Sequence, residues 1–131
     1  MKTNIIFKRY IKNNPSQEKK ITILTSGDKL WFLNGNHHRE DGPAIEWNDG
    51  SKEWFLNGKR HREDGPAIEY ANGAKEWWLN GYTHREDGPA IERSDGSKEW
   101  WLEGCWYQEE KEYWKALEEY KRNKLRENQN K

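Results

Sequence analysis

The chain repeats itself with a period of 23 residues. Related blocks, WFLNG, WFLNG, WWLNG and WWLEG, begin at Trp31, Trp54, Trp77 and Trp100. Between them the stretch HREDGPAIE stands unchanged over residues 38–46, 61–69 and 84–92. A fixed period of this kind is typical of repeat architectures, in which each unit buries its apolar side against its neighbours. We therefore expect a stack of similar units.

Each unit contains the signals of a β-hairpin. Asn48-Asp49-Gly50, Ala71-Asn72-Gly73 and Ser94-Asp95-Gly96 follow the constant stretch. Their Asx-Gly pairs predict tight two-residue turns, because both central positions tolerate positive φ. The first unit then has strands at about 44–47 and 52–56 and a loop through 57–58. Residues 21–24 and 29–33 predict an N-terminal capping hairpin, and residues 1–12 predict one more edge strand.

The pattern changes after Gly104. From about residue 107 to 127 the chain is rich in Glu, Lys, Arg and Leu and has no Gly or Pro, and Tyr113, Leu117 and Tyr120 follow helical spacing. We expect an amphipathic helix that caps the last hairpin. The predicted fold is mainly β, an elongated antiparallel hairpin sheet with a C-terminal helix. The repeat domain covers residues 1–106 (cap 1–30, repeats 31–53, 54–76 and 77–99, half-repeat 100–106), and the helix and tail cover 107–131.

Charge and composition exclude several classes of function. Lys plus Arg and Asp plus Glu each number 23, so no overall field attracts double-stranded nucleic acid or an anionic membrane. The single cysteine, Cys105, has no partner for an intramolecular disulfide, which favours a cytoplasmic setting. The N-terminal apolar run is too short for a signal peptide or a membrane span. We expect a protein that is neither exported nor membrane-inserted.

Alternation along the strands predicts two different faces. Trp54 and Leu56 point one way and Phe55 the other. Because Trp and Leu recur in every copy, we expect their face to be the core, with most of the nine Trp inside. The opposite face has a second aromatic row, which either packs under the helix, the N-terminal segment or a second subunit, or forms an open groove for a planar ligand or a partner's side chain. This row is Phe32, Phe55, Trp78 and Trp101.

The polar motif His-Arg-Glu-Asp-Gly-Pro is interpreted mainly as architecture. Gly supplies an unusual dihedral, Pro fixes the entry into the next strand, and Arg and Glu pair between neighbouring units. A metal site at His38, Glu40 and Asp41 is disfavoured because consecutive residues of an extended loop diverge. Hydrolysis by a carboxylate pair such as Glu63 and Asp64 would require three equivalent active sites. Recognition of a phosphate or carboxylate by the arginine row stays open. That row is Arg39, Arg62 and Arg85.

Positions that vary between copies are candidates for recognition. They mix basic, aromatic and small polar residues, types that are enriched in contact surfaces. One set follows each Asn-Gly or Glu-Gly, and the other is a single strand position. The first set is Asn36-His37, Lys59-Arg60, Tyr82-Thr83 and Cys105-Trp106, and the second is Trp47, Tyr70 and Arg93.

Asn57-Gly58-Lys59-Arg60-His61, the period and the closing turns resemble a variant of the MORN repeat over about residues 21–104. Arg-Glu-Asp-Gly-Pro replaces the glycines that usually follow the His, and the Tyr-x-Gly opening is missing. The HREDGPA version resembles repeat proteins of bacteria, bacteriophages and giant viruses. The resemblance implies a hairpin scaffold that contacts proteins or lipids, without catalytic residues or cofactors. It also suggests a small viral protein that inhibits a component of host defence, acting in the host cytoplasm.

Two hypotheses follow. The first is a non-enzymatic module that binds another protein or a second copy of itself as a homodimer. The alternative is a protein that sequesters a nucleotide-type signalling ligand, with aromatic side chains that stack on the base and Arg or Lys that hold the phosphates.

Overall fold

The computed structural model describes residues 5–14 and 17–130 of the chain. It begins with three long antiparallel strands, β1 (Ile5–Asn14), β2 (Gln17–Leu24) and β3 (Lys29–Leu33). The predicted N-terminal hairpin and edge strand are therefore present, and residues 1–4 of that strand lie outside the described residues.

Each repeat adds two hairpins rather than one. In the first complete unit, β5 (Ile45–Glu46) pairs with β6 (Lys52–Glu53), and a separate short hairpin joins β7 (Phe55–Leu56) to β8 (Lys59–Arg60). The same pattern recurs along the chain. The remaining strands are β4 (Asn36–His37), β9 (Ile68–Glu69), β10 (Lys75–Glu76), β11 (Trp78–Leu79), β12 (Tyr82–Thr83), β13 (Ile91–Glu92), β14 (Lys98–Leu102) and β15 (Cys105–Tyr107).

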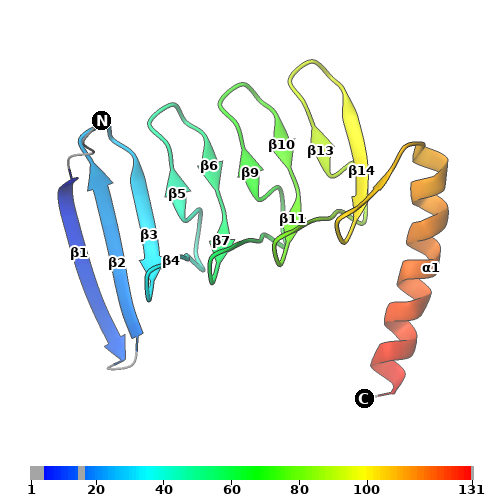
Figure 1. Ribbon diagram of the computed structural model, residues 1–131, viewed down its shortest axis with the longest axis horizontal. Coiled ribbons are helices and arrows are strands. Elements are labelled where there is room, and N and C mark those ends of the chain that lie inside the picture. Colours follow the sequence, from blue (N-terminus) through cyan, green and yellow to red (C-terminus); the bar gives the residue numbers. More distant parts are fainter. Residues whose placement is uncertain (1–4, 15–16, 131) are drawn as a thin grey trace.

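The main hairpins join into one antiparallel sheet, in the order β1-β2-β3-β5-β6-β9-β10-β13-β14-β15. The hairpins stand side by side in a curved row, and the helix α1 (Glu110–Gln129) lies at the C-terminal end of the row (Figure 1). The predicted class, a mainly β antiparallel ladder with a C-terminal helix, is confirmed. The helix begins at Glu110 instead of residue 107, because Tyr107 still pairs with Trp100 in the sheet. In the described part of the chain, no helix has the length and apolar character needed to cross a membrane.

The prediction about the turns is wrong in one respect. Residues 48–50 form a three-residue loop, closed by the hydrogen bonds from Trp47 N to Ser51 O (2.9 Å) and from Gly50 N to Trp47 O (3.0 Å). Only Gly50 has positive φ there, at 95°. The turn with two positive φ values is Asn57-Gly58, at 51° and 80°, between β7 and β8. A two-residue hairpin turn needs both central residues in this region, and Asn tolerates it.

The expectation that most Trp are inside is also wrong. All nine are described and none is fully buried. The buried apolar positions of the repeats are small or aliphatic instead, because a single-layer sheet has no second layer to enclose a row of indoles. They are Ala44, Ile45, Ala67, Ile68 and Ala90.

Candidate functional site

One face of the ladder carries Trp31, Trp54, Trp77 and Trp100, and we call it the loop face. The three loops of residues 38–43, 61–66 and 84–89, here the charged loops, fold over this face. Their guanidinium groups stack on indole rings, with the Cζ of Arg39, Arg62 and Arg85 at 4.0, 3.9 and 3.8 Å from the ring centroids of Trp31, Trp54 and Trp77. These half-buried indoles are therefore covered by cations rather than by apolar side chains.

The arginines pair within their own repeat, which corrects the predicted pairing between units. Arg62 donates to Asp64 (3.0 Å), to the carbonyl of Pro66 (3.0 Å) and to Glu69 (3.3 Å). In the first repeat, the hydrogen bond from Arg39 lowers the pKa of Asp41. Gly65 does not have positive φ, and a Cβ there would lie 3.1 Å from the Arg62 guanidinium. Glycine therefore leaves room for the arginine here, and positive φ is not the reason for it.

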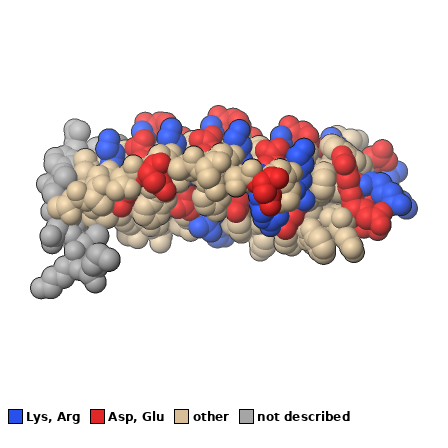
Figure 2. All heavy atoms as spheres, turned by 90° about the horizontal axis from the view of Figure 1, so that it is seen from above, with Lys and Arg blue, Asp and Glu red and all other residues tan. Residues whose placement is uncertain are grey.

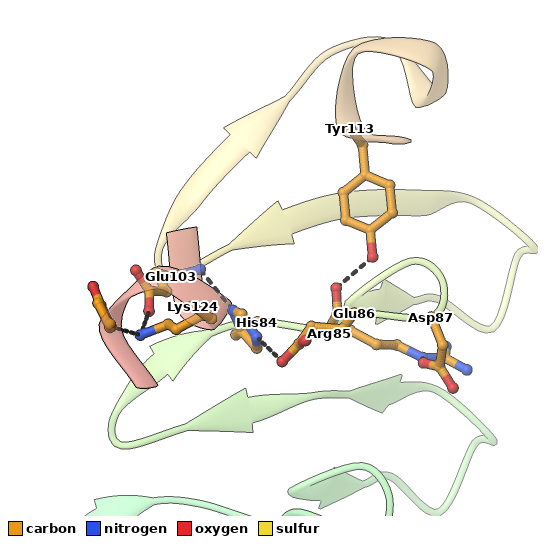
Figure 3. A network of polar contacts seen from close by, with 8 residues as sticks. His84, Arg85, Glu86, Asp87, Glu103, Tyr113 and Lys124 are labelled. Atoms are coloured by element: carbon orange, nitrogen blue, oxygen red, sulfur yellow. Dashed lines mark hydrogen bonds and ion pairs between the residues drawn. The ribbon is translucent and has the colours of Figure 1, made fainter. Parts of the chain in front are cut away.

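Histidine side chains add a contact between repeats to the strand pairing. The Nδ1 atoms of His38, His61 and His84 each accept a backbone N–H from a residue 19 positions later, at 2.9, 3.0 and 2.9 Å. The Nε2 of His84 faces Glu86 at 3.0 Å (Figure 3). Because Nδ1 accepts, the ring carries its proton at Nε2. Each histidine thus forms a hydrogen bond between its repeat and the next one.

The loop face is open between the charged loops and closed at its end. Cavities of about 750 and 620 Å³ lie between neighbouring charged loops and are lined in part by Trp54 and Trp77. Beyond the third charged loop, α1 covers the corresponding surface, where Tyr113 and Leu117 pack against Leu102. The Tyr113 hydroxyl donates to the Arg85 carbonyl (Figure 3). The helix therefore closes the ladder from the loop face.

The opposite face, the aromatic face, carries the second aromatic row. The structure brings several of the predicted site residues together here. His37 stacks on Phe32 (centroids 4.6 Å apart) and lies 5.3 Å from Phe55. The Arg60 Cζ lies 5.5 Å from the ring centroid of Phe55 and 5.4 Å from that of Trp78. The row Phe32, Phe55, Trp78 and Trp101 is half-buried, with neighbouring side chains between its rings.

Three constant carboxylates organise the variable strand position on this face. Trp47 Nε1 donates to Glu53 (2.8 Å), Tyr70 Oη to Glu76 (3.1 Å) and Arg93 Nη2 to Glu99 (2.6 Å). Indole, phenol and guanidinium thus contact the same acceptor in successive repeats. Arg93 lowers the pKa of Glu99, whereas burial and then the Glu76 charge raise the pKa of Tyr70.

The sequence analysis missed these glutamates. The signal was the Lys-Glu pair that precedes every Trp of the constant blocks from Trp54 onward.

Lys59 and Tyr82, the other predicted contact residues, stand at the tips of the short hairpins. Lys59 lies against Gly81, and Tyr82 lies against Gly104 of the following repeat. They are exposed but separate from the aromatic row. Arg39, Arg62 and Arg85 lie on the loop face, so the predicted residues do not form one site.

Charge is unevenly distributed over the surface of the molecule. Charged side chains of both signs gather in regularly spaced clusters along one long edge of the molecule, while the opposite edge is mostly uncharged (Figure 2). Over residues 5–14 and 17–130, no three His, Cys, Asp or Glu side chains are grouped to hold a metal ion.

Comparison with known proteins gives no assignment beyond this geometry. No protein-family model matches the chain, and neither a curated protein nor a solved structure shows significant similarity to it.

Proposed function

We propose that the chain is a non-enzymatic protein-binding module whose contact surface is the aromatic face. The observation that carries the proposal is a continuous row of half-buried rings on one side of a single-layer sheet, flanked by Trp47 and Tyr70 with 38% and 40% of their surface exposed. Apolar sheet faces are normally covered by a second layer. Aromatic side chains with a few charges among them are typical of protein contact surfaces.

The charges on this face favour a protein over a nucleotide. Arg60 is paired with Glu53 (3.0 Å) and Arg93 with Glu99 (2.6 Å), and Glu76 adds a further carboxylate. A phosphate at the aromatic row would therefore meet carboxylates beside every guanidinium. The repeated arginines of the loop face are also paired with carboxylates.

The nucleotide ligand and the MORN relationship stay predictions. A cytoplasmic location is part of the proposal, and the free thiol of Cys105 supports it.

The test compares two surface variants of the full chain with equal charge substitutions. The aromatic-face variant carries Tyr70→Lys and Trp106→Lys, and the control carries Glu40→Gln and Glu63→Gln on the loop face, so the net charge changes by the same amount in both variants; all four side chains are exposed. Each protein is immobilised, and captured proteins from the native host cells are quantified by mass spectrometry, while light scattering reports self-association. We expect a protein, or a second copy, that binds the wild type and the control but not the aromatic-face variant. Equal capture by all three, or none with strictly monomeric chains, contradicts the proposal.

A further inference from the structure

A small cavity lies on the aromatic face between the variable residues of two successive repeats. It has a volume of about 210 Å³ and is lined by Trp47, Tyr70, Ile68, Ser51, Asp49 and Glu53. The lining therefore combines two aromatic side chains, here called the walls, with an apolar isoleucine and two carboxylates. The neighbouring aromatic row has no such space, because His37 and Arg60 lie between its rings.

The spacing of the walls follows from the sheet. Trp47 follows β5 and Tyr70 follows β9, and one strand, β6, lies between these two. Two strand separations amount to about 9.6 Å, so a group midway between the walls lies about 5 Å from each. Cation–π attraction acts within about 6 Å of a ring centroid. The gap thus suits one compact cation held by both rings.

The walls are fixed before any ligand arrives. Glu53 accepts the Trp47 Nε1–H at 2.8 Å, and Glu76 accepts the Tyr70 hydroxyl at 3.1 Å. Each ring keeps more than a third of its surface exposed, which leaves it accessible to a ligand. Prearranged rings lose little conformational freedom on binding.

Local charge selects the sign of the ligand. Asp49, Glu53 and Glu76 contribute three carboxylates around the cavity, and Arg60 neutralises one of them through its pair with Glu53. The excess of negative charge favours a cation over an anion or a neutral group.

We propose that Trp47 and Tyr70 form an aromatic cage for an alkylammonium group, such as a quaternary amine or a methylated lysine side chain. The cage lies on the same face as the proposed protein-binding surface. It rests on the proposed function only if the ammonium group belongs to a partner protein. Arg93, which is paired with Glu99, stands in the next repeat where Trp47 and Tyr70 stand in theirs. The gap between Tyr70 and Arg93 therefore has a cationic wall and excludes a second cation. One ligand binds per chain.

The test titrates the full chain with tetramethylammonium and choline by calorimetry and by NMR of the indole N–H groups. The neutral isostere of choline, 3,3-dimethyl-1-butanol, is the control ligand. We expect both cations to bind with a stoichiometry near one and the isostere to bind more weakly. A peptide with trimethyllysine, compared with the same peptide with lysine or norleucine, identifies the source: tighter binding than choline indicates a protein side chain, and equal binding indicates a small amine.

Variants of the walls separate the cage from unspecific binding. Tyr70→Leu and Trp47→Leu should each weaken choline binding about two- to fivefold, whereas Tyr70→Phe keeps the ring and most of the affinity. Trp114→Leu, a substitution of an exposed aromatic on α1, should leave choline binding unchanged. Arg93→Trp should raise the stoichiometry towards two.

Equal binding of the isostere, or unchanged affinity in both leucine variants, overturns the cage. Amine binding without a captured protein partner leaves the cage intact and contradicts the proposed function. Capture of a partner through the aromatic face by a chain that binds no amine supports the proposed function and contradicts the cage.

Discussion

The two faces of the ladder use the same period in different ways. On the loop face the histidine and arginine contacts are made identically three times, at nearly equal distances. On the aromatic face the acceptor is constant, but its donor changes from indole to phenol to guanidinium along the row. The comparison teaches that the constant face holds the repeats together, while the other face has room to vary without loss of the fold.

The largest effect should come from the closed end of the loop face. Leu117→Ala removes a buried side chain that packs against Leu102 and Tyr113, and should lower the free energy of unfolding by about 2–5 kcal/mol. Leu125→Ala, on an exposed turn of the same helix, is the control and should leave it nearly unchanged. Chemical denaturation measures both. Similar values for the two variants would mean that α1 is not part of the cooperative structure.

The histidine contact between repeats should rank second. His84→Ala removes the acceptor of a half-buried hydrogen bond from the backbone N–H of Glu103, and should cost about 1–3 kcal/mol in the free energy of unfolding. His37→Ala on the aromatic face is the matched control, because the Nδ1 of His37 has no hydrogen-bond partner within the described residues. Thermal and urea unfolding should show the larger loss for His84→Ala. The opposite order would refute the division of roles between the faces.

Two arginine substitutions test the same difference between the faces, with a smaller expected effect on stability. Arg62→Ala removes the stacking on Trp54 and the bond to the Pro66 carbonyl, and should cost about 1–2 kcal/mol. Arg93→Ala removes an exposed ion pair on the aromatic face and should have little effect on stability. Urea midpoints of the two variants, measured in the same buffer, check the difference. Equal midpoints would show that the charged loops do not stabilise the ladder.

The smallest expected effect concerns pH on the aromatic face. Burial lowers the pKa of His37 below its ordinary value of 6.5, against an opposing contribution from Glu53. As pH falls below 6.5, the unfolded chain binds a proton at His37 before the folded chain does, so the free energy of unfolding decreases until the folded pKa is passed. His37→Phe removes this contribution. Unfolding of both proteins between pH 8 and 5 should show a shallower decrease for the variant, and parallel curves would contradict the assignment.

The period and the helical spacing were sufficient to predict the ladder and its C-terminal helix, because they depend on patterns that span many residues. The turns were less predictable. Asp49-Gly50 and Asn57-Gly58 have similar turn chemistry, and only the strand pairing decides which of them has two positive φ values. The indoles were misplaced because burial depends on whether a second layer covers the sheet, which a strand pattern does not specify.

Of the candidate site, the sequence identified the variable residues but not their contacts. Trp47, Tyr70 and Arg93 stood out by their variation, whereas the glutamates that fix them are constant and gave no signal of that kind. The predicted arginine and glutamate ladder between units failed because Arg62 reaches Glu69 seven residues further along its own unit. Side-chain reach, rather than spacing in the repeat, decides such pairs.

The departure of the chain from its period has a consequence for evolution. Tyr107 stands 23 residues after His84, and within three residues the chain becomes helical instead of beginning another charged loop. The helix therefore lies outside the repeated part, and recombination within the repeats would insert or delete whole units in frame. Such events would lengthen or shorten the ladder by one repeat at a time, and with it the number of variable positions on the aromatic face. The helix α1 would still cap the last repeat.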